Sequence, residues 1–268
     1  MAGRRGLITG VANARSIAWG IAQAAHAQGA RLILTYQSER LRSGVEALAK
    51  QVDALDVVPL DVSDDSSLMA AAQKVGATTE ALDFVLHGTA FAHREDLSGR
   101  FVEISRAGFA TALDVSAYAL VALARHFGPL LRQGVHPSLL TLTYLGAERA
   151  MPNYNVMGVA KAALEACVRY LAQDLGPEGI RVNAISAGPI RTLSAASIPG
   201  LRSMLQHVAE VAPLRRNVLI DDVGDAALFA LSALGRGMTG EIVHVDGGYN
   251  VLGAPGLTAP SPQKPVAP

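Results

Sequence analysis

The sequence predicts an α/β fold in which a single doubly wound parallel sheet of seven strands is flanked by helices. Its first sign is a series of short apolar segments with little polar alternation, typical of strands buried on both faces. These segments are residues 7–9, 31–36, 57–62, 83–88, 139–144, 181–186 and 241–248. Helical patterns fill the gaps between them, most clearly at residues 16–28, 107–131 and 155–175. This alternation favours one Rossmann-type domain.

The domain is expected to span residues 1–250, because no repeat or change of composition divides them. Within it, the helix at 16–28 should end at Gly29, a residue type that commonly follows a helix. Beyond residue 250 the chain turns to alanine, proline, glycine and serine. Residues 251–268 are therefore predicted to be a flexible tail.

Composition narrows the class of protein. Of 268 residues half are hydrophobic and 17% are charged, and the formal net charge is zero. A neutral chain gives no indication of nucleic-acid binding, and no uninterrupted apolar run approaches the ~20 residues that span a bilayer. The amino-terminus leads straight into the first strand and leaves no room for a signal peptide. We therefore expect a cytoplasmic protein without nucleic-acid or membrane partners.

Metal and disulfide chemistry are not indicated. The seven histidines are scattered, and none pair at the spacing of metal ligands, so no metal site is predicted. The single cysteine, Cys167, has no partner for an internal disulfide and lies in a helical pattern. We interpret it as a small core residue.

The first turn, GLITGVANARSIAWG at residues 6–20, passes from a strand into a helix. This is the layout of a dinucleotide-binding turn, but the usual three-glycine pattern is absent. Gly10 directly follows the strand. Ser16 can either cap the helix or offer its hydroxyl to a phosphate. On these residues alone, a phosphate-binding turn and an ordinary strand–helix turn are equally supported.

The next two strand ends carry candidate contacts to an adenosine. Gln37 stands where an acidic residue often binds the ribose, and its amide can hydrogen-bond the hydroxyls. Arg40 and Arg42 can either bind a 2′-phosphate or form a solvated helix face, and the second interpretation is favoured. Asp61 can accept from an adenine amino group or serve as a helix N-cap.

The most informative stretch is residues 140–172. Tyr144 ends a strand, Tyr154 begins a helix, and Lys161 follows by nearly two helical turns, so the last two side chains share a face. A phenol at the carboxyl end of a parallel sheet can hydrogen-bond or protonate a substrate oxygen, and an ammonium nearby would stabilise its phenolate form. On spacing alone, a core tyrosine with a surface lysine is the better supported alternative.

The sequence resembles the short-chain dehydrogenase/reductase superfamily and, within it, the enoyl-[acyl-carrier-protein] reductases, from residue 7 to about residue 246. The usual superfamily pattern is Tyr-x3-Lys, but this chain has Gly158 at that lysine position and Lys161 instead. Tyr-x6-Lys with an upstream tyrosine is the enoyl reductase variant. Residues 143–166 and 176–195 are similar to that family almost throughout.

This resemblance implies a reaction. The chain would reduce the 2,3-double bond of trans-2-enoyl thioesters, carried on acyl carrier protein, in fatty-acid elongation. The cofactor would be NADH rather than NADPH, and the usual assembly of the family is a homotetramer. Tyr154 and Lys161 would be catalytic, with a share for Tyr144. The alternatives are a reductase of ketones or 3-oxoacyl thioesters and a catalytically idle dinucleotide-binding protein.

The resemblance also implies site residues. The cofactor would contact the first turn and the strand ends, through Gly10, Ser16, Ile17, Gln37, Asp61, Val62, Ala90, Lys161, Ile190 and Thr192. The substrate would contact Phe91, Ala92, Tyr144, Tyr154, Met157, Ala195, Ile198 and Leu201. The chain departs from the family at Gly88 and Thr89, which bears on cofactor affinity. It departs again at Leu201, where an aromatic residue often stands, which bears on chain-length preference.

Overall fold

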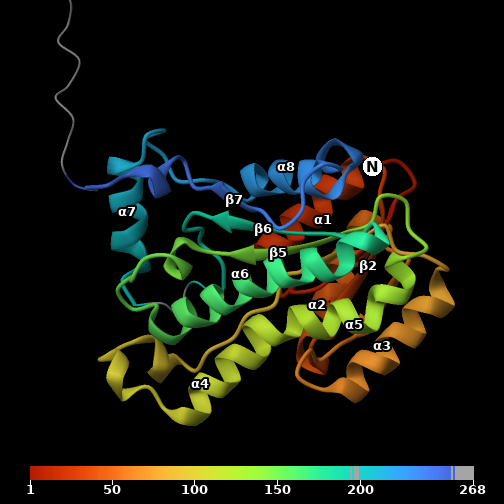
Figure 1. Ribbon diagram of the computed structural model, residues 1–268, viewed down its shortest axis with the longest axis horizontal. Helices are drawn as coiled ribbons and strands as arrows, with labels where there is room; N and C mark the ends of the chain where they lie inside the picture. The colour runs from red at the N-terminus through yellow and green to blue at the C-terminus, as the bar shows by residue number, and fades with distance from the viewer. Residues whose placement is uncertain (194, 196–198, 255, 257–268) are drawn as a thin grey trace, which may run out of the picture.

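The strands form where the sequence has short apolar segments. A computed structural model describes residues 1–193, 195, 199–254 and 256. These residues form one seven-stranded sheet in the order β3-β2-β1-β4-β5-β6-β7, with every pair parallel (Figure 1). The strands are β1 Arg5–Ile8, β2 Arg31–Tyr36, β3 Asp56–Pro59, β4 Phe84–His87, β5 Ser138–Thr143, β6 Arg181–Ala187 and β7 Ile242–Val245. The predicted fold class is confirmed.

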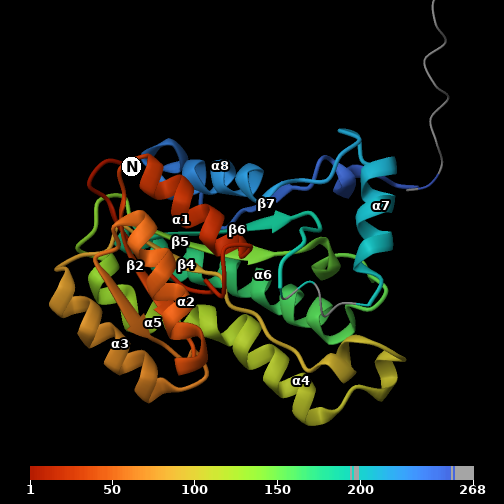
Figure 2. The ribbon, with the colours of Figure 1, turned by 180° about the vertical axis from the view of Figure 1, so that it is seen from behind.

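Helices cover both faces of the sheet. Those in the described residues are α1 Ile17–Ala27, α2 Glu39–Ala49, α3 Asp65–Thr78, α4 Arg106–Leu113, α5 Ala119–Leu131, α6 Asn155–Leu175, α7 Leu201–Val211 and α8 Ile220–Leu231. Helices α1, α2 and α8 pack on one face and α3, α5 and α6 on the other. Helices α4 and α7 extend beyond the end of the sheet to which the strands point (Figures 1 and 2). Gly29 follows α1 with a φ of 84°, as predicted.

The core consists of two apolar layers, one on each face of the sheet. Successive strand residues point to opposite faces. Leu7 and Val85 accordingly join the layer of α5 and α6, while Ile8 and Leu86 join the layer of α1 and α8. All four side chains are fully buried. Burial on both faces explains why the strand segments show no polar alternation.

The predicted helix at 107–131 is not regular. A π-helical turn, Asp114–Tyr118, separates α4 from α5. Hydrophobic periodicity cannot reveal one extra residue in a turn, which is why the sequence gives no sign of it. The turn contains Ser116, a fully buried residue whose hydroxyl accepts from the backbone N–H of Phe91 at 3.0 Å. The irregular turn therefore holds the loop that follows β4.

The helical stretch Arg106–Leu131 is long and apolar enough to cross a membrane by length and composition alone, with a mean hydropathy of 1.6 in its most apolar 18-residue window. The sequence has no uninterrupted apolar run of this length, because charged residues interrupt the stretch. These charges do not make it polar on average. In the fold, 56% of its most apolar window is buried. The core helix of a folded domain has this character.

The chain remains attached to the fold just beyond residue 250. The guanidinium of Arg149 donates to the backbone oxygens of Asn250 at 2.6 Å and Leu252 at 3.0 Å. These contacts include the start of the segment predicted to be a tail. Residues 255 and 257–268 of that segment lie outside the described residues.

Replacing Asp83 with alanine should destabilise the fold by about 2–5 kcal/mol, because two backbone donors lose their acceptor. The buried Asp83 carboxylate accepts from the N–H groups of Arg5 and Val135, each at 2.7 Å, and thereby joins the starts of β1, β4 and β5. Urea unfolding measures the loss. Asp174→Ala, at an exposed position of α6, is the control, and an equal loss in both variants would contradict the prediction.

Candidate active site

The site lies at the carboxyl ends of the strands, where chain connections leave β1 and β4 in opposite directions. In open α/β sheets this switch point is where ligands bind. Gly10 follows β1 with a φ of 84°, and a Cβ at this position would overlap the backbone oxygen of Gly88. A Cβ on Gly88 would in turn lie 2.6 Å from the oxygen of Thr9. Side chains are thus excluded here, and backbone lines the switch point.

The loop after Gly10 presents the start of α1. Ser16 stands at the N-cap position in an extended conformation, but its side chain does not cap the helix. Its hydroxyl oxygen instead accepts from the N–H groups of Ala12 and Asn13, both at 3.1 Å. The capping alternative is therefore wrong. The first N–H groups of α1 remain without a side-chain cap, and such groups suit the pyrophosphate of a dinucleotide.

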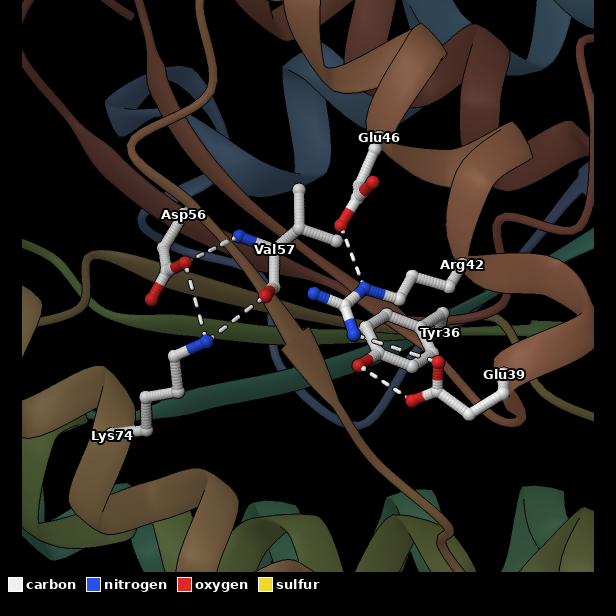
Figure 3. A network of polar contacts seen from close by, with 7 residues as sticks. All are labelled: Tyr36, Glu39, Arg42, Glu46, Asp56, Val57 and Lys74. Carbon is white, nitrogen blue, oxygen red and sulfur yellow. Dashed lines mark hydrogen bonds and ion pairs between the residues drawn. The ribbon is translucent and has the colours of Figure 1, made fainter.

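Gln37, predicted to contact the adenosine ribose, is exposed directly after β2. Figure 3 shows the nearby network, in which the Arg42 guanidinium donates to Glu46 at 2.8 Å and to Glu39 at 3.5 Å. The same guanidinium lies 5.9 Å from the centroid of the Tyr36 ring. Arg42 is thus paired with carboxylates on the solvated face of α2. This supports the favoured interpretation, in which Arg42 belongs to a solvated helix face and does not bind a 2′-phosphate.

Asp61 follows the end of β3 by two residues, but it does not cap the next helix. Its carboxylate accepts from the backbone N–H of Ser63 at 3.0 Å and from the Ser63 hydroxyl at 2.7 Å. Asp64 is the N-cap of α3, accepting from the N–H of Ser66 at 2.9 Å. The N-cap alternative for Asp61 is therefore wrong. Val62 is buried beside it in the core.

Tyr154 is held in a fixed direction at the start of α6. Its neighbours Asn153 and Asn155 have φ values of 60° and 32°, a region that asparagine tolerates better than most residues. Their side-chain amides donate to the backbone oxygens of Pro199 at 3.0 Å and Gly99 at 3.2 Å. The two bonds fasten the flanking loops around the tyrosine.

The two tyrosines form a pair. Their ring centroids are 5.0 Å apart at an interplanar angle of 70°, and the Tyr144 hydroxyl donates to the sulfur of Met204 at 3.3 Å. A Cβ on Gly146 would lie 2.5 Å from the Tyr154 ring, so glycine is needed between them. Burial raises the pKa of both phenols well above the usual range, and Tyr144 and Glu165 raise that of Tyr154 further. Tyr154 is therefore a neutral phenol that can donate a hydrogen bond.

Lys161 lies in the interior, 6% exposed, and the alternative of a surface lysine is wrong. Its ammonium donates to the backbone oxygen of Leu142, at the end of β5, at 2.7 Å. Burial lowers the pKa of Lys161 to about 8, and the carboxylate of Glu165 opposes that shift. A cation is thus held at the carboxyl end of the sheet, on the helix that begins at Tyr154.

The position of the superfamily's usual lysine is closed in this fold. A Cβ on Gly158 would lie 2.8 Å from the backbone oxygen of Gly146, in the segment between the two tyrosines. A lysine there would displace the strand–helix connection that carries Tyr154. The Tyr-x6-Lys spacing is thus matched by the packing around it.

Other predicted cofactor residues lie at the same edge. Ala90 is exposed directly before Phe91, the residue held by Ser116. Ile190 packs on the core layer of α1 and α8. The hydroxyl of Thr192 accepts from the N–H of Ala195 at 3.0 Å. The structure therefore gathers segments that are distant in sequence around the switch point.

Four predicted substrate residues share one apolar cluster: Ala92, Tyr144, Tyr154 and Met157. Phe91, directly before Ala92 in the chain, is 46% exposed, with its ring 5.1 Å from that of His93. Leu201 begins α7, the helix whose Met204 reaches Tyr144. Ile198 lies outside the described residues.

Several residues at the site escape sequence reasoning. Ser116 sits in the π-helical turn, and Met204 contacts a tyrosine 60 positions away in the chain, so no local pattern marks either one. Glu165 has a signal that could have been used. It lies one helical turn after Lys161, on the same face of α6.

The doubly wound parallel sheet, the backbone-lined turn at its switch point, and the tyrosine and lysine of α6 define a reductase of the short-chain dehydrogenase/reductase class. A family model described as enoyl-(acyl carrier protein) reductase matches residues 10–250, and the chain belongs to this family. The predicted family, its reductase class and the use of a nicotinamide cofactor are thus confirmed.

Curated relatives cover nearly the whole chain. The NADH-dependent enoyl-[acyl-carrier-protein] reductase FabI of Salmonella typhimurium is 50% identical over 252 residues, 94% of this chain and 95% of the relative. The FabI of Bacillus cereus is 51% identical over 253 residues, 94% of this chain and 98% of the relative.

Solved structures agree. The B. cereus enzyme with NADP+ and indole naphthyridinone has a TM-score of 0.92 at 50% identity, covering 94% of this chain and 98% of that one. The reductase of Anaplasma phagocytophilum in complex with NAD has a TM-score of 0.91 at 48% identity, covering 97% of each chain.

Proposed function

We propose that this protein reduces the 2,3-double bond of trans-2-enoyl thioesters, carried on acyl carrier protein, in fatty-acid elongation, with NADH as cofactor. One observation carries the proposal. The neutral Tyr154 phenol and the buried Lys161 ammonium project from one helix at the switch point of the sheet, with the Tyr144 ring against Tyr154.

The reaction follows from what the site can stabilise. Bound NADH supplies a hydride to the β-carbon of the substrate. Negative charge then develops on the thioester oxygen, and the Tyr154 hydroxyl donates a hydrogen bond there, aided by the positive end of α6. The pKa of Tyr154, raised chiefly by burial, keeps the phenol protonated for that task. Its apolar surroundings exclude water and strengthen the bond.

The cofactor would lie across the carboxyl ends of the strands. Lys161 would bind the nicotinamide ribose, and the uncapped start of α1 would face the pyrophosphate. The remaining contacts would come from Gly10, Ser16, Ile17, Gln37, Asp61, Val62, Ala90, Ile190 and Thr192. Substrate would be enclosed by the apolar cluster, with Phe91, Ala92, Met157, Ala195 and Leu201 around Tyr144 and Tyr154.

The preference for NADH over NADPH has its own support. Arg42 already pairs with Glu39 and Glu46, so its charge is engaged. The Glu39 carboxylate, at the start of α2, would also repel a 2′-phosphate bound near Gln37. Arg40, exposed in the same turn, is the residue through which NADPH would still be accepted.

Loss of reduced-nicotinamide absorbance tests the proposal. With a short trans-2-enoyl thioester the purified protein should oxidise NADH, and NADPH more slowly. A 3-oxoacyl thioester, the control substrate, should give no turnover. Turnover of the oxo substrate alone would assign ketone reduction instead. Cofactor binding without turnover of either substrate would assign an idle dinucleotide-binding protein.

We also propose a cytoplasmic homotetramer. Phe109 on α4 and Tyr118 in the π-helical turn are 36% and 41% exposed, and a second copy could cover these rings. The single cysteine suits a reducing compartment. Sedimentation velocity should give four times the chain mass, and a monomer would contradict this assembly.

A further inference from the structure

Helix α6 is fastened to the end of β5 by two side chains. Lys161 donates to the backbone oxygen of Leu142 at 2.7 Å. One helical turn later, the Glu165 carboxylate accepts from the Thr143 hydroxyl, also at 2.7 Å. A cation and a carboxylate on one face of a helix thus contact consecutive residues of one strand.

Both members of this pair are removed from solvent. Lys161 is 6% exposed and Glu165 is 7% exposed. A buried ammonium is costly unless an opposite charge is close. Glu165 is the carboxylate whose charge favours the protonated form of Lys161 and opposes the effect of burial on its pKa.

His87 is another titratable group close enough to Lys161 to affect its charge, but it cannot replace Glu165. His87, at the end of β4, is buried against Thr141, with 2.7 Å between its Nδ1 and the threonine hydroxyl. Burial lowers the pKa of His87 to about 3, with Lys161 adding to the shift. His87 is therefore neutral at physiological pH and offers the lysine no negative charge.

We propose that Glu165 is a positioning residue that keeps Lys161 positively charged and seated against β5, ready to bind the cofactor. This inference rests on the ribose-binding role proposed for Lys161. In this proposal Glu165 contacts neither the cofactor nor the substrate, and it acts only through Lys161.

The pH range of the effect follows from the groups around Glu165. Burial raises the pKa of Glu165, and the hydrogen bond from the Thr143 hydroxyl lowers it. Among the neighbouring charges, Glu148 after β5 raises this pKa, whereas Arg169 on α6 and His244 on β7 lower it. Below the Glu165 pKa the carboxylate is neutral and Lys161 is charged without it. Above that pKa, the charge of Lys161 depends on Glu165 increasingly as the pH rises toward 8 and beyond.

Direct titration of Lys161 tests the inference in the intact protein. The chain has only four lysines, so lysine labelled with ¹³C at the ε-carbon gives few NMR signals, and Lys161→Met identifies the relevant one. Glu165→Gln keeps an acceptor for Thr143 and removes the charge. We expect it to lower the Lys161 pKa by about one unit. Glu80→Gln, the same change at an exposed position before β4, should leave it unaltered.

A second variant protects the test against misfolding. Thr143→Val leaves Glu165 in place but removes its donor, which raises the Glu165 pKa. Because the carboxylate keeps its charge at the pH where Lys161 titrates, the Lys161 pKa should change less than in Glu165→Gln. An unchanged Lys161 titration in both variants would overturn the inference.

NADH binding separates this inference from the proposed role of Lys161. In Glu165→Gln, NADH affinity should match the unmodified protein at pH 6 and be weaker at pH 8.5. If the Lys161 pKa shifts but neither Glu165→Gln nor Lys161→Met alters NADH binding, Glu165 still supports the charge. The ribose-binding role of the lysine would then be wrong.

Discussion

Lys161→Met is expected to weaken NADH binding by about 10–100-fold, because one or two charge-assisted hydrogen bonds to the cofactor would be lost. The ammonium lies at the end of β5, held by Leu142 at 2.7 Å, where it can reach the ribose of a dinucleotide crossing the switch point. Methionine fills the same space without charge. Fluorescence titration with NADH measures the affinity, and saturating NADH separates it from the rate.

The rate should fall too, by about 10²–10⁴ in kcat/KM for an enoyl thioester, because a misplaced nicotinamide no longer meets the substrate held at Tyr154. Lys74→Met is a matched control. Lys74 also donates to a strand oxygen, that of Val57 at 3.1 Å, and pairs with Asp56 at 3.4 Å (Figure 3). It is exposed on α3, beside the edge strand β3. Unchanged NADH affinity in Lys161→Met would remove the lysine from the cofactor site.

The architecture could be predicted from the sequence because local hydrophobic patterns determine its strands and helices. Helix α6 spans Asn155–Leu175, the range predicted from its apolar spacing, and every predicted strand lies within a few residues of an observed one. Parallel strands separated by helices leave few arrangements, since crossovers are right-handed and consecutive strands are usually neighbours. The proposed catalytic pair, Tyr154 and Lys161, was harder to predict, because spacing alone favoured a core tyrosine with a surface lysine. Only resemblance to a family distinguished the alternatives.

What the sequence could not supply are contacts between distant segments and the charge state of buried groups. The hydrogen bond from Tyr144 to Met204 depends on where α7 packs against the rest of the fold. The acceptor role of Ser16 depends on the path of a loop, which no propensity describes. The charge state of Tyr154 was open for the same kind of reason. Spacing placed the lysine on the right face but could not show that burial would dominate the pKa of the phenol.

Tyr154→Phe should slow enoyl reduction by about 10²–10³-fold while NADH affinity stays within a factor of about two, because only the donor to the developing charge is lost. The ring itself, 8% exposed and packed against Tyr144, remains in place, so the fold should be unaffected. Steady-state kinetics at saturating NADH, with an NADH titration of each variant, give both quantities.

Tyr144→Phe is the informative comparison, because the same chemical change is made one ring away. The Tyr144 hydroxyl donates to the sulfur of Met204, a weak acceptor, and so points toward α7. Its loss should cost less than about tenfold, the scale of a single neutral hydrogen bond. Equal losses in the two variants would mean that both phenols face the thioester oxygen. A larger loss in Tyr144→Phe would transfer the donor role from Tyr154 to Tyr144.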